Sequence, residues 1–289
     1  MTWRETIGKA TAYLDAKGVP DAAVAAESLA ARLLKCGRGL LASSLEKEVS
    51  ERFLEAIRRA MARLAKGEPL QYVIGEWDFR TLTLGCDRRA LIPRPETEEL
   101  VTRVLAFLKA KRAAEPEARP FVVDVGTGTG AIILSLAKEY GGSAVLLGTD
   151  VSEDAIALAK ENAARCGLQN RVKLAIADGL DEFDEPGIVD VIVSNPPYVE
   201  SAVCEALDPR VKDWEPRLAL DGGASGLDFY DRYLGDALNI LKPGGAVFFE
   251  IGENQGASVR KLMFDYGFDG ISIEKDFAGH DRYASAVLP

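Results

Sequence analysis

The chain has 289 residues, of which 47% are hydrophobic and 28% charged, and it carries a formal net charge of −10 at pH 7. That length can bury the cores of one large and one small domain without disulfides, and so acidic a surface disfavours a nucleic-acid backbone as the partner. The sequence contains no apolar run of roughly 18 residues, so we expect no membrane partner. Its four cysteines are widely spaced and form no CxxC pair, so we expect no metal site and the reduced thiols of a cytoplasmic protein.

The N-terminal part has the apolar spacing of helices and no strand pattern. Ser50 is a suitable N-cap for one of these helices. We therefore predict a small helical domain at residues 1–69, and we hypothesise that it recognises the substrate.

From Gln71 to Leu91 the sequence alternates and contains β-branched and aromatic residues, which predicts a β-hairpin or extended linker within residues 70–95.

Residues 96–289 are predicted to form a second domain in which strands and helices alternate. The stretch "PRPETEEL" opens a helix that runs to about Lys111, because Pro95 suits a first turn and the acidic residues suit its positive end. Apolar runs then predict seven strands, at residues 121–125, 144–149, 172–176, 189–194, 246–251, 271–274 and 283–288. Capped helices separate several of them, such as the helix after Ser152. This is the pattern of a seven-stranded, doubly wound α/β sheet of the Rossmann-like class.

The stretch "VVDVGTGTGAIILSLAKE" follows the first of these strands and opens a helix. Gly126, Gly128 and Gly130 allow a tight turn and let a ligand approach the backbone closely. Their spacing also satisfies the dinucleotide fingerprint. The loop therefore predicts a ligand site without choosing between NAD and S-adenosylmethionine.

Two aspartates follow the next strands at the same edge of the predicted sheet. Asp150 ends the second strand, about twenty residues after the glycine loop, where a carboxylate can accept hydrogen bonds from both ribose hydroxyls of either cofactor. The alternative is that Asp150 caps the next helix. Asp178 follows the third strand and can meet an adenine amino group, unless it is simply a solvent-facing turn residue.

The fourth strand runs into an unusual turn, "DVIVSNPPYVE". Each proline fixes φ and keeps the preceding residue out of the α region. The Asn195 side-chain oxygen and the Pro196 carbonyl can then point to one spot, which suits an NH2 group, and Tyr198 offers a flat face for a planar group. Two acceptors would also stabilise the positive charge that develops when such a nitrogen is methylated. The alternative is a rigid turn at the end of a strand.

Together, "DVGTGTG" and "NPPY" resemble the Rossmann-like methyltransferases that modify planar NH2 nitrogens. NPPY alone is shared with enzymes that act on adenine or guanine in nucleic acids. The stretch "YVIGEWDFRTLTLGCDRRALIPRPETEELV", residues 72–101, is similar to the linker motif of the HemK/PrmC family, the glutamine methyltransferases of peptide chain release factors. The later blocks "EPRLALDGGASGLDFY", "LKPGGAVFFEIGENQG" and "DFAGHDRY" also resemble that family, so the resemblance extends from about residue 70 to the C-terminus.

The resemblance implies a cofactor site and a glutamine site. The residues expected to bind S-adenosylmethionine, with S-adenosylhomocysteine as product, are Thr97, Gly126, Thr127, Gly128, Thr129, Gly130, Asp150, Val151, Asp178, Gly179, Leu180 and Asn195. Relatives often place an aromatic residue after the aspartate of this block. Because Gly179 cannot stack, Leu180 is expected to cover the adenine instead. The residues expected to bind the glutamine amide are Asn195, Pro196, Pro197 and Tyr198, of which Asn195, Pro196 and Tyr198 would be catalytic.

The reaction that the resemblance implies is methyl transfer from S-adenosylmethionine to the amide nitrogen (N5) of the glutamine in the GGQ loop of class-1 release factors, which modulates translation termination. We expect a cytoplasmic monomer with no direct nucleic-acid contact. The main alternative is an amino-methyltransferase that acts on adenine or guanine of DNA or RNA. A non-catalytic S-adenosylmethionine-binding protein would predict a damaged motif, and an NAD dehydrogenase would leave NPPY and PRPET without a purpose.

Overall fold

The computed structural model describes residues 1–181, 183 and 185–289. They form two compact units, which we call the helical unit (residues 1–76 and 208–214) and the sheet unit (residues 77–207 and 215–289). The boundary lies later than the predicted residue 69, and the chain returns to the helical unit at 208–214. A Cβ atom on Gly67 would lie 3.7 Å from the Trp214 indole nitrogen, so this returning segment packs directly on the end of the bundle.

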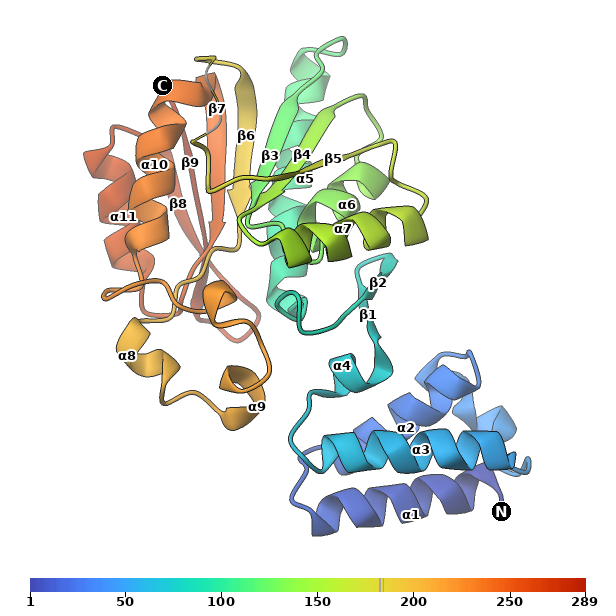
Figure 1. Cartoon of the computed structure of the whole chain (residues 1–289). Helices are drawn as coiled ribbons and strands as arrows, with labels where there is room; N and C mark the ends of the chain where they lie inside the picture. Colours follow the sequence, from blue (N-terminus) through green and yellow to red (C-terminus); the bar gives the residue numbers. More distant parts are fainter. Residues whose placement is uncertain (182, 184) are drawn as a thin grey trace. The chain divides into compact units, whose positions relative to one another are not determined.

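The helical unit confirms the helical pattern of the N-terminal sequence (Figure 1). Its elements are α1 (Trp3–Ala16), α2 (Ala22–Leu33), the 3-10 helix η1 (Arg38–Ser44), α3 (Glu51–Leu64), α4 (Leu70–Ile74) and α9 (Pro209–Lys212). The Ser50 hydroxyl accepts a hydrogen bond from the Phe53 backbone N–H at 3.4 Å, so the predicted cap of α3 is present. Trp3 and Leu14 are the largest fully buried side chains of its core.

The predicted hairpin is present, but it is shorter than expected. It consists of β1 (Glu76–Phe79) and β2 (Leu82–Gly85). The preceding residues form helix α4, so the expectation of extended structure from Gln71 onwards was wrong. Pro69 starts this helix, Tyr72 is buried, and Gly75 closes it with φ +81°, which a glycine adopts without steric cost.

The sheet unit contains the seven predicted strands. They are β3 (Phe121–Val125), β4 (Val145–Asp150), β5 (Lys173–Ile176), β6 (Val189–Ser194), β7 (Leu241–Glu250), β8 (Asp269–Lys275) and β9 (Asp281–Val287). Their order is β5-β4-β3-β6-β7-β9-β8. The first five strands in this order are parallel, whereas β9 is antiparallel to both of its neighbours. All five parallel strands therefore end at one edge of the sheet.

Helices cover both faces of this sheet (Figure 1). One face is covered by α5 (Pro95–Ala114), α6 (Ala131–Glu139) and α7 (Glu153–Arg165). These helices pack against the alternate side chains of β3, β6 and β7 that point to this face. On the other face the same strands contact α10 (Asp228–Ile240) and α11 (Gly256–Asp265). Strands buried on both sides explain the continuous apolar runs seen in the sequence. The shorter elements α8 (Ser201–Cys204) and η2 (Arg217–Ala219) follow β6.

No helix in the described part of the chain is long and apolar enough to cross a membrane. All four cysteines are free thiols, at positions 36, 86, 166 and 204. The Cys86 side chain is buried, which raises the pKa of its thiol to about 12.

Candidate active site

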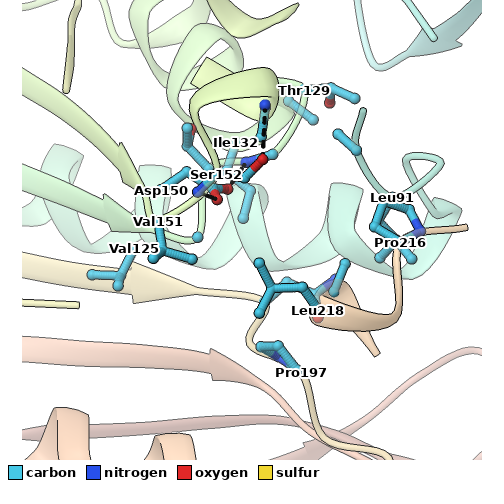
Figure 2. A pocket seen from close by; sticks show the side chains of 18 of the residues that line it. Leu91, Val125, Thr129, Ile132, Asp150, Val151, Ser152, Pro197, Pro216 and Leu218 are labelled. Atoms are coloured by element: carbon cyan, nitrogen blue, oxygen red, sulfur yellow. Dashed lines mark hydrogen bonds between the residues drawn. The ribbon is translucent and has the colours of Figure 1, made fainter. Parts of the chain in front are cut away.

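The carboxyl ends of the parallel strands surround a cavity of about 390 Å³ in the sheet unit. Figure 2 shows its wall, with Asp150 beside the glycine loop, Leu91 before α5, and Leu218 and Pro197 from the segments after β6. Small-molecule sites in open α/β sheets lie at this edge, and they have volumes of roughly 300–1,000 Å³. The cavity is therefore of the size and in the place expected for a cofactor.

The glycine loop after β3 is held in a conformation that only glycine adopts easily. Gly126, Gly128 and Gly130 have φ of +72°, +54° and +82°. A Cβ on Gly126 would meet no atom within 4 Å, so the absence of a side chain leaves open space beside the backbone. Gly126 and Gly128 line the cavity together with Thr127 and Thr129, whereas Gly130 does not. Gly130 instead starts α6, where a Cβ would lie 3.0 Å from Leu134.

The fully buried carboxylate of Asp124 holds the glycine loop from the core side. Asp124 accepts hydrogen bonds from the Thr127 hydroxyl at 2.6 Å and from the Ile133 backbone N–H at 3.3 Å. Burial raises the pKa of Asp124 to about 7, although both hydrogen bonds oppose the shift. Asp124 thus fixes the loop from the core side and does not line the cavity.

Asp150 lines the cavity at the end of β4. Its two carboxylate oxygens accept hydrogen bonds from the backbone N–H groups of Gly128 and Ser152, each at 2.9 Å. The cap of α7 is Ser152, whose hydroxyl accepts from the Ala155 N–H, so Asp150 is not needed for that purpose. Burial raises the pKa of Asp150. Val151, the next residue, also lines the cavity and is 49% exposed.

The block after β5 differs from the sequence-based expectation. Asp178 and Gly179 line the cavity, but Leu180 is only 2% exposed and belongs to the core cluster of the sheet unit. The structure therefore corrects the expectation that Leu180 covers a ligand. Phe229 and Tyr233 of α10 line the cavity instead. A side chain at residue 179 would approach the Tyr233 ring to 3.1 Å, which explains why a glycine stands there.

Arg232 of α10 holds Asp178 in place. Its guanidinium donates to the Asp178 carboxylate and to the Asp178 carbonyl, both at 2.7 Å, and to Asp181 at 2.6 Å. The sequence gives no local signal for this arginine, because it lies on a helix 54 positions away from Asp178.

The NPPY turn is fixed by contacts to a glycine-rich segment and a glutamine. Asn195 and Pro197 line the cavity, whereas Pro196 is buried and Tyr198 packs partly against the core. The Gln255 side-chain amide donates to the Tyr198 carbonyl at 3.0 Å. A Cβ on Gly226 would lie 2.4 Å from the same carbonyl oxygen. The structure thus places Pro196 and Tyr198 outside the cavity wall, so a stacking role for the Tyr198 ring stays a prediction.

Three residues from different elements meet beside this turn. The Asn195 amide nitrogen donates to the Thr97 hydroxyl at 3.0 Å, and that hydroxyl donates to the Glu250 carboxylate at 2.6 Å. Thr97 lies in the first turn of α5 and is 4% exposed, while Glu250 ends β7 and is 1% exposed. Burial raises the pKa of Glu250 to about 7. Glu250 is not among the site residues predicted from the sequence, although it carries the same signal as Asp150, a lone carboxylate at the end of an apolar strand.

The segment before α5 is anchored by Glu215, a second buried carboxylate that is absent from the site predicted from the sequence. Glu215 accepts from Arg94 at 2.5 Å and from the Ile92 backbone N–H at 3.0 Å. Its side chain is 1% exposed, against 33% for Arg94. This ion pair and the hydrogen bond to Ile92 fix the segment before α5 against residue 215.

The seven-stranded sheet, the glycine loop and the strand-end carboxylates define a class I, S-adenosylmethionine-dependent methyltransferase. A family profile described as "Methyltransferase domain" matches residues 120–263, and a profile described as "PrmC N-terminal domain" matches residues 5–75. The chain belongs to the family of release factor glutamine methyltransferases.

Curated relatives match the chain over nearly its whole length. A release factor glutamine methyltransferase of Moorella thermoacetica is 38% identical over 284 residues, covering 98% of this chain and 97% of the relative. One of Koribacter versatilis is 36% identical and covers 100% and 99%. The human "MTRF1L release factor glutamine methyltransferase" is 34% identical and covers 96% of this chain and 85% of the relative.

Among solved structures, the catalytic domain of hMettl16 in complex with a MAT2A 3′UTR hairpin superimposes with a TM-score of 0.57. The two chains are 15% identical, and the match covers 83% of each. The N-terminal domain of human METTL16 in complex with SAH gives a TM-score of 0.52 at 17% identity, covering 72% of this chain and 76% of that one. At these identities the likeness concerns the fold alone.

Proposed function

We propose that this protein transfers a methyl group from S-adenosylmethionine to the side-chain amide nitrogen (N5) of the glutamine in the GGQ loop of class-1 peptide chain release factors. The proposal rests on the position of Asn195, which lines the cavity at the end of β6. Its amide nitrogen is already hydrogen-bonded to the Thr97 hydroxyl. Its remaining polar atom, the carbonyl oxygen Oδ1, is then available to an amide NH2 group. Membership of the family supplies the substrate class.

The cavity suits the cofactor. Open space beside Gly126 leaves room for a ligand close to the backbone, and Asp150 presents a carboxylate at the end of the neighbouring strand, where ribose hydroxyls can be bound. Phe229 and Tyr233 give one wall an aromatic surface beside Asp178, against which an adenine can pack. S-adenosylmethionine supplies a methyl group on a positively charged sulfur.

The residues of the NPPY turn then orient the nucleophile. Among the described residues, neither Asn195 Oδ1 nor the Pro196 carbonyl accepts a hydrogen bond from the protein. Asn195 Oδ1 can accept from one hydrogen of a glutamine NH2 group at the cavity wall, and the Pro196 carbonyl, which lies outside that wall, can accept from the other once the amide reaches past Asn195. The two hydrogen bonds would direct the nitrogen lone pair. They also stabilise the positive charge that develops on the amide nitrogen as the new bond forms. Burial raises the pKa of Tyr198 to about 12, so the phenol stays neutral at pH 7 and does not serve as a base.

The proposed substrate has consequences for the setting of the reaction. Release factors act in translation, so the proposal implies a cytoplasmic protein. We propose that it works as a monomer that contacts a protein loop, and that nucleic acid is not its substrate. The formal net charge of −10 supports a protein partner over a phosphate backbone.

The test is mass spectrometry of a class-1 release factor after incubation with this protein and S-adenosylmethionine. We expect one added methyl group on the GGQ glutamine. Asn195→Ala should reduce the rate by about 100-fold or more, as for loss of one charge-stabilising group. Asn170→Ala is the matched control, since Asn170 is exposed in the turn before β5, which lies three strands away from β6 in the sheet, and its loss should leave the rate unchanged.

A parallel reaction offers total RNA and DNA to the same preparations. Methylation of nucleic acid without methylation of the release factor would overturn the proposal and favour a base as the group bound by NPPY. Methylation of the release factor at another residue would show that the cavity accepts a different nucleophile.

A further inference from the structure

The chain of hydrogen bonds from Asn195 through Thr97 to Glu250 has only one consistent direction when Glu250 is charged. A carboxylate only accepts hydrogen bonds, so the Thr97 hydroxyl must give its single proton to Glu250 across the 2.6 Å contact. The Thr97 oxygen can then only accept, so the partner at 3.0 Å must be the Asn195 NH2 group. The opposite side of the amide, Oδ1, is left for the cavity.

The direction can reverse when Glu250 is neutral. A protonated Glu250 can donate to the Thr97 oxygen, which frees the Thr97 proton to point at Asn195. The amide of Asn195 can then turn over and accept that proton with Oδ1. Its NH2 group would face the cavity, where it would meet the NH2 hydrogens of a substrate amide, and two donors repel each other.

We propose that Glu250, acting through Thr97, is a positioning residue that sets which side of the Asn195 amide faces the substrate. This inference rests on the proposed function, because the acceptor side matters only for a substrate that brings an NH2 group. Glu250 would act without contacting substrate or cofactor. It lies at the end of β7 and does not line the cavity.

The burial of Glu250 indicates that its charge serves a purpose. Among the described residues, no ion pair within 4.0 Å neutralises this carboxylate, which is 1% exposed. An uncharged side chain of the same shape would avoid the desolvation cost of a buried charge. Orienting the Thr97 proton is a task for which a carboxylate is suited and a carboxamide is not, because the carboxamide can donate as well as accept.

Several groups influence the charge of Glu250. Arg282 and Arg94 favour the charged form, and Glu96 disfavours it. Tyr230 donates its hydroxyl proton to the Glu250 backbone carbonyl at 3.0 Å and not to the carboxylate. The other titratable groups that interact with it are Tyr198 and Tyr283. Burial outweighs the arginines and raises the pKa of Glu250 to about 7, so the orientation of Asn195 should change within an accessible pH range.

The first test compares the pH dependence of kcat for release factor methylation in the wild type and in Glu250→Gln, between pH 5.5 and 8.5. We expect the kcat of the wild type to decrease as the pH falls below about 7, which gives the pH profile an acidic limb. Glu250→Gln should lack this acidic limb, and its kcat at pH 8 should be roughly tenfold to a hundredfold lower than that of the wild type. The change Glu253→Gln is the matched control, because the Glu253 side chain is 51% exposed. A Glu250→Gln protein with the wild-type kcat and pH profile would overturn the proposal.

Changes at Thr97 test the intermediate step. Thr97→Val has nearly the same shape without the hydroxyl and should show the same loss of kcat and of the pH limb. Thr97→Ser keeps the hydroxyl and should restore most of the rate lost in Thr97→Val. Full activity of Thr97→Val would contradict a relay through this residue. Melting temperatures of all variants are recorded, and a loss of rate that follows a loss of folded protein would mean that the residues are merely structural.

A second measurement needs no substrate, so it remains decisive even if the proposed function fails. The side-chain amide signals of Asn195 are followed by NMR in protein labelled with nitrogen-15 at asparagine, and they are assigned by their absence in Asn195→Ala. We expect one pH-dependent shift with a midpoint near that of the kcat limb, absent from Glu250→Gln and Thr97→Val. An Asn195 signal that does not respond to pH or to Glu250→Gln would refute the positioning role.

Discussion

The two units of this protein differ in how deeply they bury carboxylates. In the helical unit the ion pairs are mainly exposed, as between Arg58 and Glu51, whose side chains are 67% and 76% exposed. In the sheet unit, carboxylates such as Asp124 and Glu250 are almost completely buried. Exposed ion pairs contribute little to stability, whereas a buried carboxylate is costly unless its hydrogen bonds are satisfied. The difference indicates which unit carries the chemistry.

The largest expected effect on stability concerns the ion pair between Arg94 and Glu215. Arg94→Ala removes the cation beside a carboxylate that is 1% exposed, so we expect a loss of about 2–4 kcal/mol of unfolding free energy, below the range for fully buried pairs because Arg94 is partly exposed. Arg58→Ala in the helical unit is the counterpart and should cost less than about 1 kcal/mol. Urea unfolding of both variants measures the two losses of unfolding free energy. Equal losses would contradict the expected difference between the two units.

A matched pair of glycine substitutions should give the next largest difference. Gly226 has φ +70° and its added Cβ would lie 2.4 Å from the Tyr198 carbonyl oxygen, so Gly226→Ala should destabilise the protein by about 2–3 kcal/mol and slow methylation by displacing the NPPY turn. Gly8 lies within α1, and a Cβ there would meet no atom within 4 Å. Gly8→Ala should stabilise the protein by roughly 0.5–1 kcal/mol. Thermal unfolding and kcat of the two variants check these signs.

Stability should also depend on pH in the sheet unit. Burial raises the pKa of Asp124 and of Glu250 to about 7, above their ordinary values near 4, so the folded state binds more protons than the unfolded state between about pH 4 and 7. The free energy of unfolding should therefore fall as pH rises through this window, by about 2 kcal/mol for each of the two groups between pH 5 and 7. Carboxylates with a lowered pKa, such as Asp190, lose their contribution only at lower pH.

Hydrogen exchange read by mass spectrometry separates the two units in this experiment. After correction for the intrinsic exchange rate, peptides from β3 and β7 should lose protection from pH 5 to 7. The double variant Asp124→Asn, Glu250→Gln should flatten this trend. Sheet protection that increased with pH would contradict the raised pKa values.

Removing residues 1–66 is expected to have the smallest effect on the energetics of the reaction. Circular dichroism first establishes that the remaining chain is folded. If the helical unit recognises the release factor, the KM for intact factor should rise by about tenfold, equivalent to about 1.4 kcal/mol. The KM for a short GGQ peptide should hardly change. An equal change for both substrates would reject a recognition role, and the packing of residues 208–214 with this unit makes the peptide control necessary.

The sequence was most informative where local pattern determines structure. Buried parallel strands are apolar on both faces, so β3 and β6 were located at their observed bounds. The strand-end residues Asp150 and Asn195 were found because carboxyl ends share one edge of a parallel sheet.

The sequence was least informative where the contacts join distant residues. Thr97 and Glu250 are 153 positions apart, and no periodicity relates them. Leu180 was assigned to the cavity because Gly179 cannot stack on an adenine, but the chain turns at Gly179, with φ +68°, and the Leu180 side chain packs in the core. The association of residues 208–214 with the helical unit likewise depends on tertiary packing at Gly67.

The buried carboxylate of Glu250 has a consequence for how such proteins respond to selection. A screen for folding alone should favour uncharged side chains at this position, because they avoid the cost of burying a charge, whereas a screen for turnover should retain glutamate. Positions at which these two selections disagree mark residues that are kept for activity at the expense of stability. A scan of every residue under both selections would therefore locate the positions of this protein that are kept for turnover, including those that do not line the cavity.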